Sequence, residues 1–103
     1  MTDFVVILST APEGDADEIA SALVEESLAA CVSISQVRSH FTWEGKIFKE
    51  IEDLMIIKTE SNLVDRVRTR IKDLHSYELP EIIVLPIIGG DTGYLKWIEQ
   101  AVG

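Results

Sequence analysis

Two long stretches of alternating residues, joined by a glycine turn, constrain the fold of this chain more than any other feature. They run from Cys31 to Trp43 and from Ile47 to Thr59, about thirteen residues each, on either side of Glu44 and Gly45. Alternation with a period of two predicts strands, and the short connection predicts a tight hairpin turn. Because strands usually have about five or six residues, this hairpin should reach beyond the body of a 103-residue domain.

The outer half of the hairpin carries more apolar side chains than one short chain can cover, namely Val37, Phe41, Trp43, Phe48 and Ile51. Exposed apolar strand edges promote aggregation unless another chain covers them. We therefore expect a homo-oligomer whose subunits associate through these arms. The alternative is a hairpin bent back over its own sheet. The apolar pattern also changes phase near Gln36, which predicts a β-bulge or a change of buried face.

The remaining segments complete a recognisable order of elements. A strand, Phe4–Leu8, is expected to be buried on both faces, and a helix of about four turns follows, capped by Asp15 with Glu18 and extended by Leu28. After the hairpin come a helix capped by Ser61 or Asn62, a short buried strand at Ile82–Leu85 and a terminal helix from Tyr94 to Val102. The order βαββαβ plus one helix predicts an α+β, ferredoxin-like sandwich forming a single domain over residues 1–103.

The charge balance limits the possible partners. Lys and Arg total 9 and Asp and Glu total 18, giving a formal net charge of −9. Phosphate-binding surfaces and anionic membranes require a surplus of positive charge, so neither nucleic acid nor membrane is expected as a partner. Asp3 stands where a secretion signal has a basic residue, and Cys31 is the only cysteine, so we expect a cytoplasmic protein.

His75 and Cys31 are the first candidates for chemistry. His75 follows a predicted helix, where its positive form would interact favourably with the helix dipole; imidazole is also the commonest metal ligand. The dipole interpretation is favoured, because no second histidine or cysteine stands at a metal-ligand spacing. Cys31 is expected to be a core residue, and His40 to face solvent on the hairpin.

A second group surrounds Pro80. Glu78 is expected in a solvated loop, whereas Glu81 directly precedes a buried run and should need a partner. Lys58, at the end of a central strand, is its expected partner: the two form an ion pair, or they line a polar pocket with Tyr77. The turn at Gly89 lacks a phosphate-binding pattern and is interpreted as a plain turn.

Six segments, taken in order, carry a pattern that spans the chain: Ser9–Pro12, Leu28–Val32, Ser39–Ile47, Leu54–Thr59, His75–Ile82 and Tyr94–Ile98. Each is short, but together they are specific. By these segments the chain resembles the CutA family of divalent-cation tolerance proteins. The resemblance implies a ferredoxin-like fold that forms a tight homotrimer through long strand arms, with an architecture similar to PII-type signalling proteins.

The resemblance also implies candidate site residues. Copper-binding members of the family use a cysteine and one or two histidines, whose places are held here by Ser9, Leu74 and His75, so that only His75 keeps its ligand type. Four further residues match the family pattern: Trp43, Lys58, Tyr77 and Glu81. We interpret these four as a pocket between subunits or as structural features of the trimer.

Three functional hypotheses follow. The first is a cytoplasmic homotrimer involved in tolerance of divalent metal ions, which binds copper or another divalent cation weakly, with His75 as a ligand. The second is a PII-like sensor or scaffold that binds a small anion in a cleft between subunits, with Lys58 and Tyr77 as donors. The third is an enzyme using Glu81 or Cys31. No spacing favours the third, so neither catalysis nor an organic cofactor is expected.

Overall fold

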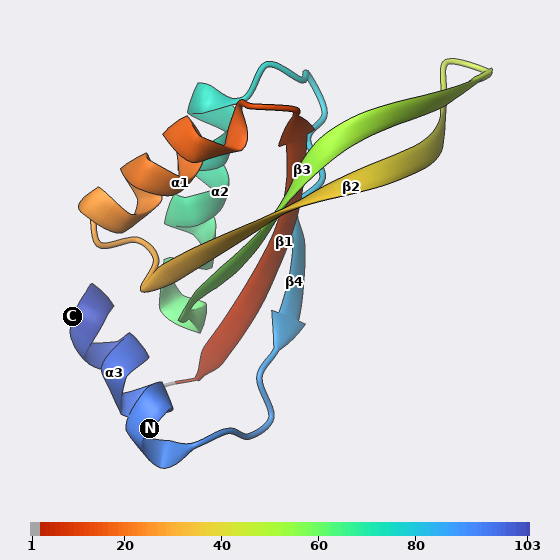
Figure 1. The fold of residues 1–103 in the computed structure, drawn as a ribbon. Helices are drawn as coiled ribbons and strands as arrows, with labels where there is room; N and C mark the ends of the chain where they lie inside the picture. Colours follow the sequence, from red (N-terminus) through yellow and green to blue (C-terminus); the bar gives the residue numbers. More distant parts are fainter. Residues whose placement is uncertain (1–2) are drawn as a thin grey trace.

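A four-stranded antiparallel sheet forms the centre of the computed structural model, which describes residues 3–103 (Figure 1). The strands lie in the order β2-β3-β1-β4. Their bounds are β1 Phe4–Pro12, β2 Cys31–Trp43, β3 Lys46–Glu60 and β4 Ile83–Pro86; the helices are α1 Ala16–Glu25, α2 Val64–Leu74 and α3 Thr92–Val102, with a 3-10 turn at Ser61–Leu63. The predicted ferredoxin-like α+β sandwich with a long hairpin and an extra terminal helix is confirmed.

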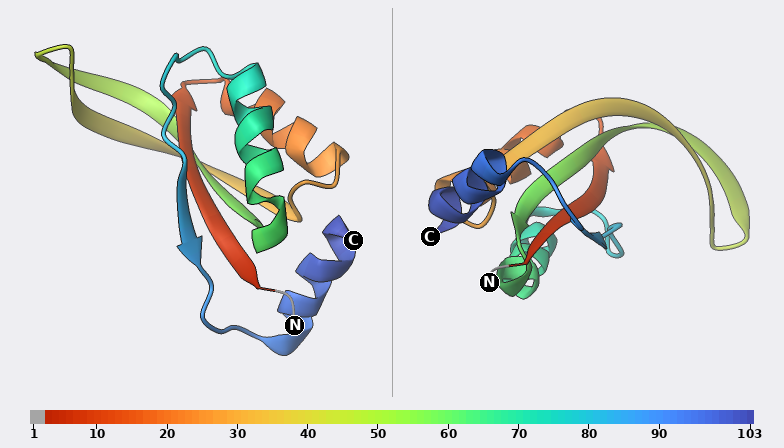
Figure 2. Two further views of the ribbon diagram at one scale, coloured as in Figure 1. Left: turned by 180° about the vertical axis from the view of Figure 1, so that it is seen from behind. Right: turned by 90° about the horizontal axis from the view of Figure 1, so that it is seen from below.

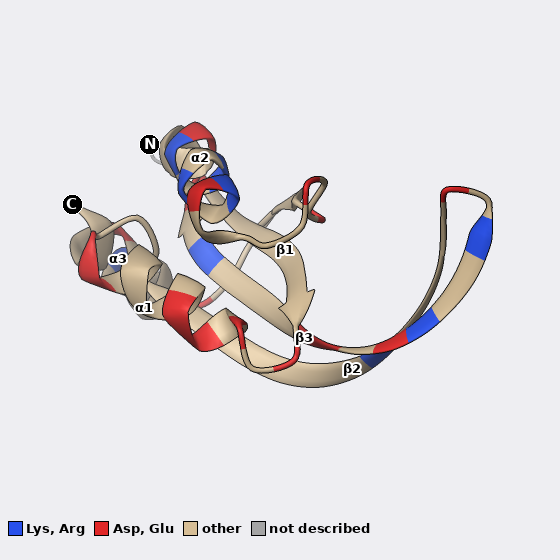
Figure 3. Ribbon diagram, turned by 90° about the horizontal axis from the view of Figure 1, so that it is seen from above, with Lys and Arg blue, Asp and Glu red and all other residues tan. Residues whose placement is uncertain are grey.

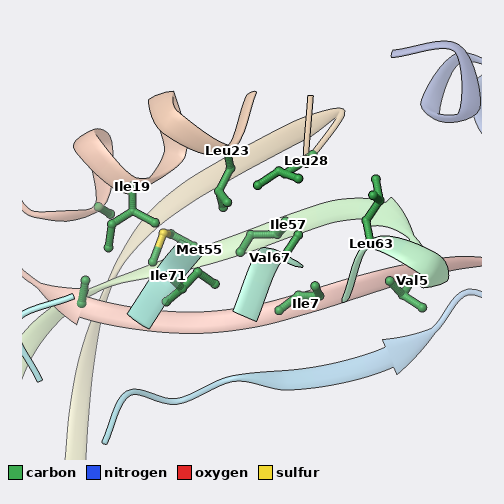
Figure 4. Packing of buried hydrophobic residues seen from close by; sticks show 13 residues of the cluster. Val5, Ile7, Ile19, Leu23, Leu28, Met55, Ile57, Leu63, Val67 and Ile71 are labelled. Atoms are coloured by element: carbon green, nitrogen blue, oxygen red, sulfur yellow. The ribbon is translucent and has the colours of Figure 1, made fainter. Parts of the chain in front are cut away.

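The core lies between one face of this sheet and the helices α1 and α2. Along β1 every second side chain is buried, as the alternation of Val5, Ile7 and Ala11 with half-buried neighbours shows. Figure 4 shows Ile19 and Leu23 of α1 meeting Met55 and Ile57 of β3 in this layer. Alternate burial is what a sheet covered on one side requires. The expectation that β1 is buried on both faces was therefore wrong within a single chain.

The hairpin is the longest part of the molecule and leaves its body. Glu44 and Gly45 have φ values of 49° and 75°, so the predicted tight turn has two central residues in the left-handed region, as in a type I′ turn. The two arms stay paired in one register from Cys31↔Lys58 to Trp43↔Lys46, so the predicted β-bulge near Gln36 is absent. The apolar pattern changes phase near Gln36 because the outer arms leave the helices and curve away as a ribbon (Figure 2).

Asp15 is the N-cap residue of α1, as predicted, whereas the predicted cap of the second helix was wrong. The side chain of Asp15 makes no capping hydrogen bond, and α1 spans 10 residues rather than four turns. It ends because Ser27 is left-handed (φ 58°), which lets the amide of Leu28 donate to the carbonyl of Leu23. Leu28 is buried all the same, beyond the helix. In the second helix a 3-10 turn occupies the segment where Ser61 or Asn62 was expected to cap.

The sheet face opposite α1 and α2 has no cover in the described chain (Figure 2). The predicted buried strand at Ile82–Leu85 is observed at Ile83–Pro86 as an exposed edge strand, with Ile83 49% and Leu85 45% exposed. We expected so apolar a strand to be central. It lies at the edge because it pairs with β1, and the other side of β1 is already paired with β3. Among residues 3–103, no helix is both long enough and apolar enough to cross a membrane.

Candidate functional site

A cleft of about 710 Å³ lies between the curved face of the hairpin and the segment that follows α2. Cross-strand register puts Ser39 opposite Glu50 and Phe41 opposite Phe48, so these four side chains share one face of the ribbon. The other wall comes from residues 76–81. The lining residues are Thr10, Ser39, His40, Phe41, Trp43, Glu44, Phe48, Glu50, Glu52, Ser76, Tyr77, Glu78, Leu79 and Glu81.

Two walls of the cleft are joined by Tyr77 and Glu52. The Tyr77 hydroxyl donates to Oε2 of Glu52 at 3.0 Å. Burial, reinforced by this hydrogen bond to a carboxylate, raises the pKa of Tyr77 to about 12. Glu52 is only 5% exposed and stands between Pro12 and Val37 in the sheet. Tyr77 therefore keeps its proton and fixes the segment after α2 against the base of the hairpin.

His75 holds the Tyr77 segment in place through hydrogen bonds and ring packing. Its Nε2 lies 2.6 Å from the carbonyl oxygen of Thr10, and its Nδ1 accepts from the amide of Tyr77 at 3.0 Å. Since a carbonyl only accepts and an amide N–H only donates, the ring is in the neutral form with its hydrogen on Nε2. The two rings also pack with centroids 4.8 Å apart. Both ring nitrogens are thus engaged, and a metal ion at Nδ1 would have to displace the Tyr77 amide.

The structure brings three of the predicted residues into the cleft: Trp43, Tyr77 and Glu81. Trp43 stands at the hairpin turn and is 43% exposed. His40 is exposed, as expected for a solvated residue, but it also lines the cleft. Glu78, expected in a solvated loop, is exposed in the lining as well.

The cleft is acidic. Its lining includes five glutamates and neither a lysine nor an arginine. Figure 3 shows the basic residues mainly on α2, on the far side of the body from the hairpin turn, with a few along the hairpin. Such a lining attracts cations and repels anions.

Lys58 lies outside this cleft. Its ammonium donates to Oγ of Ser33 at 3.2 Å and approaches Sγ of Cys31 at 3.9 Å. The expected ion pair with Glu81 does not form within residues 3–103, whose two salt bridges are Arg68–Asp65 and Arg70–Glu26. Cys31 is half-buried on the uncovered sheet face, so its assignment to the core was also wrong. A strand end next to apolar residues suggested burial, but the helices cover only the other face.

Of the places compared with copper ligands, His75 contacts the carbonyl of Thr10, the residue that follows Ser9. Ser9 points into the core, is fully buried and has no hydrogen-bond partner for its hydroxyl. Leu74 packs against the core, and His75 is bonded as described above. In the part of the chain that the structure describes, no three His, Cys, Asp or Glu side chains converge closely enough to hold a metal ion.

A family model described as the CutA1 divalent ion tolerance protein matches residues 4–101, almost the whole described chain. The chain belongs to this family. The divalent-cation tolerance protein CutA of Pectobacterium atrosepticum is 40% identical over 104 residues, covering 99% of this chain and 94% of that protein. The chloroplastic CutA 1 of rice is 39% identical over 94% of this chain, which spans only 56% of the rice protein.

Solved structures of CutA proteins agree with the fold. The protein described as the periplasmic divalent cation tolerance protein CutA from Archaeoglobus fulgidus has a TM-score of 0.93 at 43% identity, with 100% of both chains covered. The chain's membership of the CutA family of divalent-cation tolerance proteins and its ferredoxin-like fold are thus both established.

Sequence reasoning missed Glu52, a buried residue that lines the cleft. Glu52 was part of a mixed stretch of the hairpin, and nothing marked it as buried. The signal that was available is the register of the hairpin: a turn at Glu44 and Gly45 places Glu52 opposite Val37, on the same face as Phe41 and Trp43. What the register did not reveal is that Tyr77, from a distant segment, would reach Glu52.

Proposed function

We propose that this CutA chain acts in divalent-cation tolerance as a cytoplasmic homotrimer that binds divalent metal ions, copper among them, weakly through its acidic cleft. This proposal is based on the lining of that cleft, which has five glutamates and no lysine or arginine. Three copies at −9 each would give a trimer a formal charge of −27. Such a field concentrates cations around the molecule before any specific contact forms.

Weak rather than tight binding is proposed because the ligands are spread out. Divalent cations such as Mg²⁺ often keep several waters and use only one or two carboxylates. Glu50, Glu78 and Glu81 offer that kind of contact from opposite walls of the cleft. His75 is the candidate for a stronger contact with copper, since its imidazole is a good ligand once Nδ1 is released from Tyr77.

The uncovered surfaces support the trimer. The hairpin makes the chain 45 Å long against 25 and 21 Å in the other directions. Phe41, Trp43 and Ile51 on the hairpin and Ile83 and Leu85 on β4 remain between 37 and 50% exposed. Exposed apolar strands at a sheet edge need cover from another chain.

The anion-binding alternative is less well supported. Its two proposed donors do not face one space: Lys58 is bonded to Ser33, and the Tyr77 hydroxyl already donates to Glu52. An anion entering the cleft would meet carboxylates. The proposal is also one of binding rather than catalysis.

Calorimetric titration with Cu(II) and with Mn(II), combined with sedimentation equilibrium, tests the proposal. We expect a trimer, weak saturable binding of both ions, and reduced Cu(II) binding in His75→Ala. Unchanged Cu(II) binding in His75→Ala would remove His75 from the site. A monomer would contradict the assembly, and a reporter fusion found outside the cytoplasm would contradict the compartment.

A further inference from the structure

The pairing of its own two strands does not fix the direction in which the hairpin leaves the body. Burial along β3 ends at Glu52 and Asp53, and the outer arms continue as a ribbon of two strands (Figure 2). Such ribbons are marginally stable by themselves and twist more than wider sheets. The turn at Glu44 lies about 26 Å beyond Gln36, at ~3.3 Å per residue. A tilt of about 10° at the base would therefore move the turn by about 4–5 Å.

Two hydrogen bonds hold the base of the hairpin from the side of the helices. Gln36 and Asp53 are opposite one another in the register and share the face on which Met55 enters the core. Both side chains bind the loop between β1 and α1. Nε2 of Gln36 donates to Oε2 of Glu13, and Oδ2 of Asp53 accepts from the amide of Gly14 at 2.9 Å. Each strand of the hairpin is thus attached to the same loop.

A third hydrogen bond holds the base from the opposite face. Glu52 precedes Asp53 in β3, so its side chain lies on the other face, where it accepts from the Tyr77 hydroxyl at 3.0 Å. Glu52 and Asp53 are 5% and 8% exposed, so water competes little for these two bonds. Hydrogen bonds to carboxylates are also stronger than those between neutral groups. The ribbon is therefore held from both faces where it leaves the body.

We propose that these three hydrogen bonds, the hinge contacts, set the direction of the hairpin and so allow the arm of one copy to fit the next. The inference rests on the homotrimer of the proposed function and names the residues that prepare a single chain for it. Protein interfaces are packed as densely as protein interiors at their centres, so an arm displaced by several ångströms would not fit. The hinge contacts form within one chain, and they need no open surface on the outer arm.

An exchange of two hydrogen-bonding side chains tests this without changing the net charge. Gln36→Glu alone puts two carboxylates together and breaks the contact with Glu13, and adding Glu13→Gln restores it with donor and acceptor reversed. Tyr77→Phe removes the contact on the other face. Arg70→Met is the matched control, because it removes the salt bridge to Glu26 in the helix layer and leaves the hairpin untouched.

The direction of the arm can be measured as the distance between two spin labels. They would be attached at Lys46→Cys beside the turn and at Lys72→Cys on α2, with Cys31→Ser to remove the natural thiol. Dilution with unlabelled chain restricts the measurement to pairs within one chain. We expect a shorter distance in Tyr77→Phe, because the arm is then held only from the helix side. Gln36→Glu should give a longer distance, and the exchanged pair should restore it.

Sedimentation equilibrium should show association of the trimer weakened about tenfold in Gln36→Glu and in Tyr77→Phe, as the loss of one hydrogen bond would give. The exchanged pair and Arg70→Met should associate as the natural chain does. Unchanged distances in both hinge variants would overturn the proposal, as would shifts of the same sign. Association weakened equally by Arg70→Met would also overturn it, because a general loss of stability would then be the cause. If the natural chain is a monomer, the proposed assembly fails, and the distances still decide whether the hinge contacts set the direction of the arm.

Discussion

Ser9 offers the sharpest test of the packing described above. Its hydroxyl is fully buried between β1 and the helices and has no hydrogen-bond partner within the described residues. Burying an unpaired hydroxyl costs about 1–3 kcal/mol. Ser9→Ala removes that cost and leaves an oxygen-sized space of roughly 10 Å³, worth a few tenths of a kcal/mol at ~24 cal/mol per Å³. We expect the free energy of unfolding to rise by about 1 kcal/mol.

Thr59 provides a matched control in the neighbouring strand. It is just as fully buried, but its Oγ1 donates to the carbonyl of Leu28 at 2.7 Å. Thr59→Val keeps the shape and deletes the hydrogen bond, so it should lower the free energy of unfolding by about 1 kcal/mol or more. The free energy of unfolding should therefore rise in Ser9→Ala and fall in Thr59→Val.

Urea unfolding followed by circular dichroism measures both variants. It must be done at one protein concentration, because assembly makes apparent stability depend on concentration. With a slope of about 2 kcal/mol per molar urea, the midpoint for Ser9→Ala should rise by about 0.5 M. If Ser9→Ala is destabilised as much as Thr59→Val, the hydroxyl has a partner and the reasoning is refuted.

Three further predictions concern the hairpin and the segment after α2. Trp43→Asp at the hairpin turn should weaken the proposed trimer, and a mutant that sediments unchanged would contradict a role for the arm in assembly. His75→Ala removes the bonds to Thr10 and to the Tyr77 amide and should lower the free energy of unfolding by about 1–3 kcal/mol, measured by urea titration; wild-type stability would show that the bonds contribute nothing. The raised pKa of Tyr77 means that the folded state holds this proton longer than the unfolded state, so stability should fall as the pH rises from about 10 to about 12. Tyr77→Phe should lose that part of the decline and Tyr94→Phe should not; equal curves for both would contradict the assignment.

The fold could be predicted from the sequence because its signals are local. The turn at Glu44 and Gly45, the long alternation on both sides of it and the helical spacing of Val67 and Ile71 each depend on neighbouring residues only. The capping hydrogen bond expected from Asp15 is absent because a side chain of this kind has several possible conformations, and the chosen one depends on tertiary contacts. The burial of β4 was misjudged because an apolar strand at an uncovered edge has the same composition as a central strand.

The site was harder to predict, because it is built from contacts between distant segments. Trp43, Tyr77 and Glu81 do meet in one cleft, but Lys58 faces Ser33 instead. The bond from Tyr77 to Glu52 joins residues 25 positions apart, on elements whose relative placement no spacing encodes. His75 was considered for its charge and its affinity for metals, whereas in this structure it organises the backbone of the Tyr77 segment.

In the proposed function a specific acidic cleft, rather than general negative charge, binds divalent cations. Calorimetric titration with Mn(II) of two charge-matched variants tests it most directly. Glu50→Gln with Glu81→Gln removes two charges from the cleft, and Glu18→Gln with Glu99→Gln removes two from exposed positions on α1 and α3. We expect the cleft variant to lose most of its Mn(II) binding, while the helix variant binds as the natural chain does. Equal binding by the two variants would contradict it, because only the overall charge would then matter.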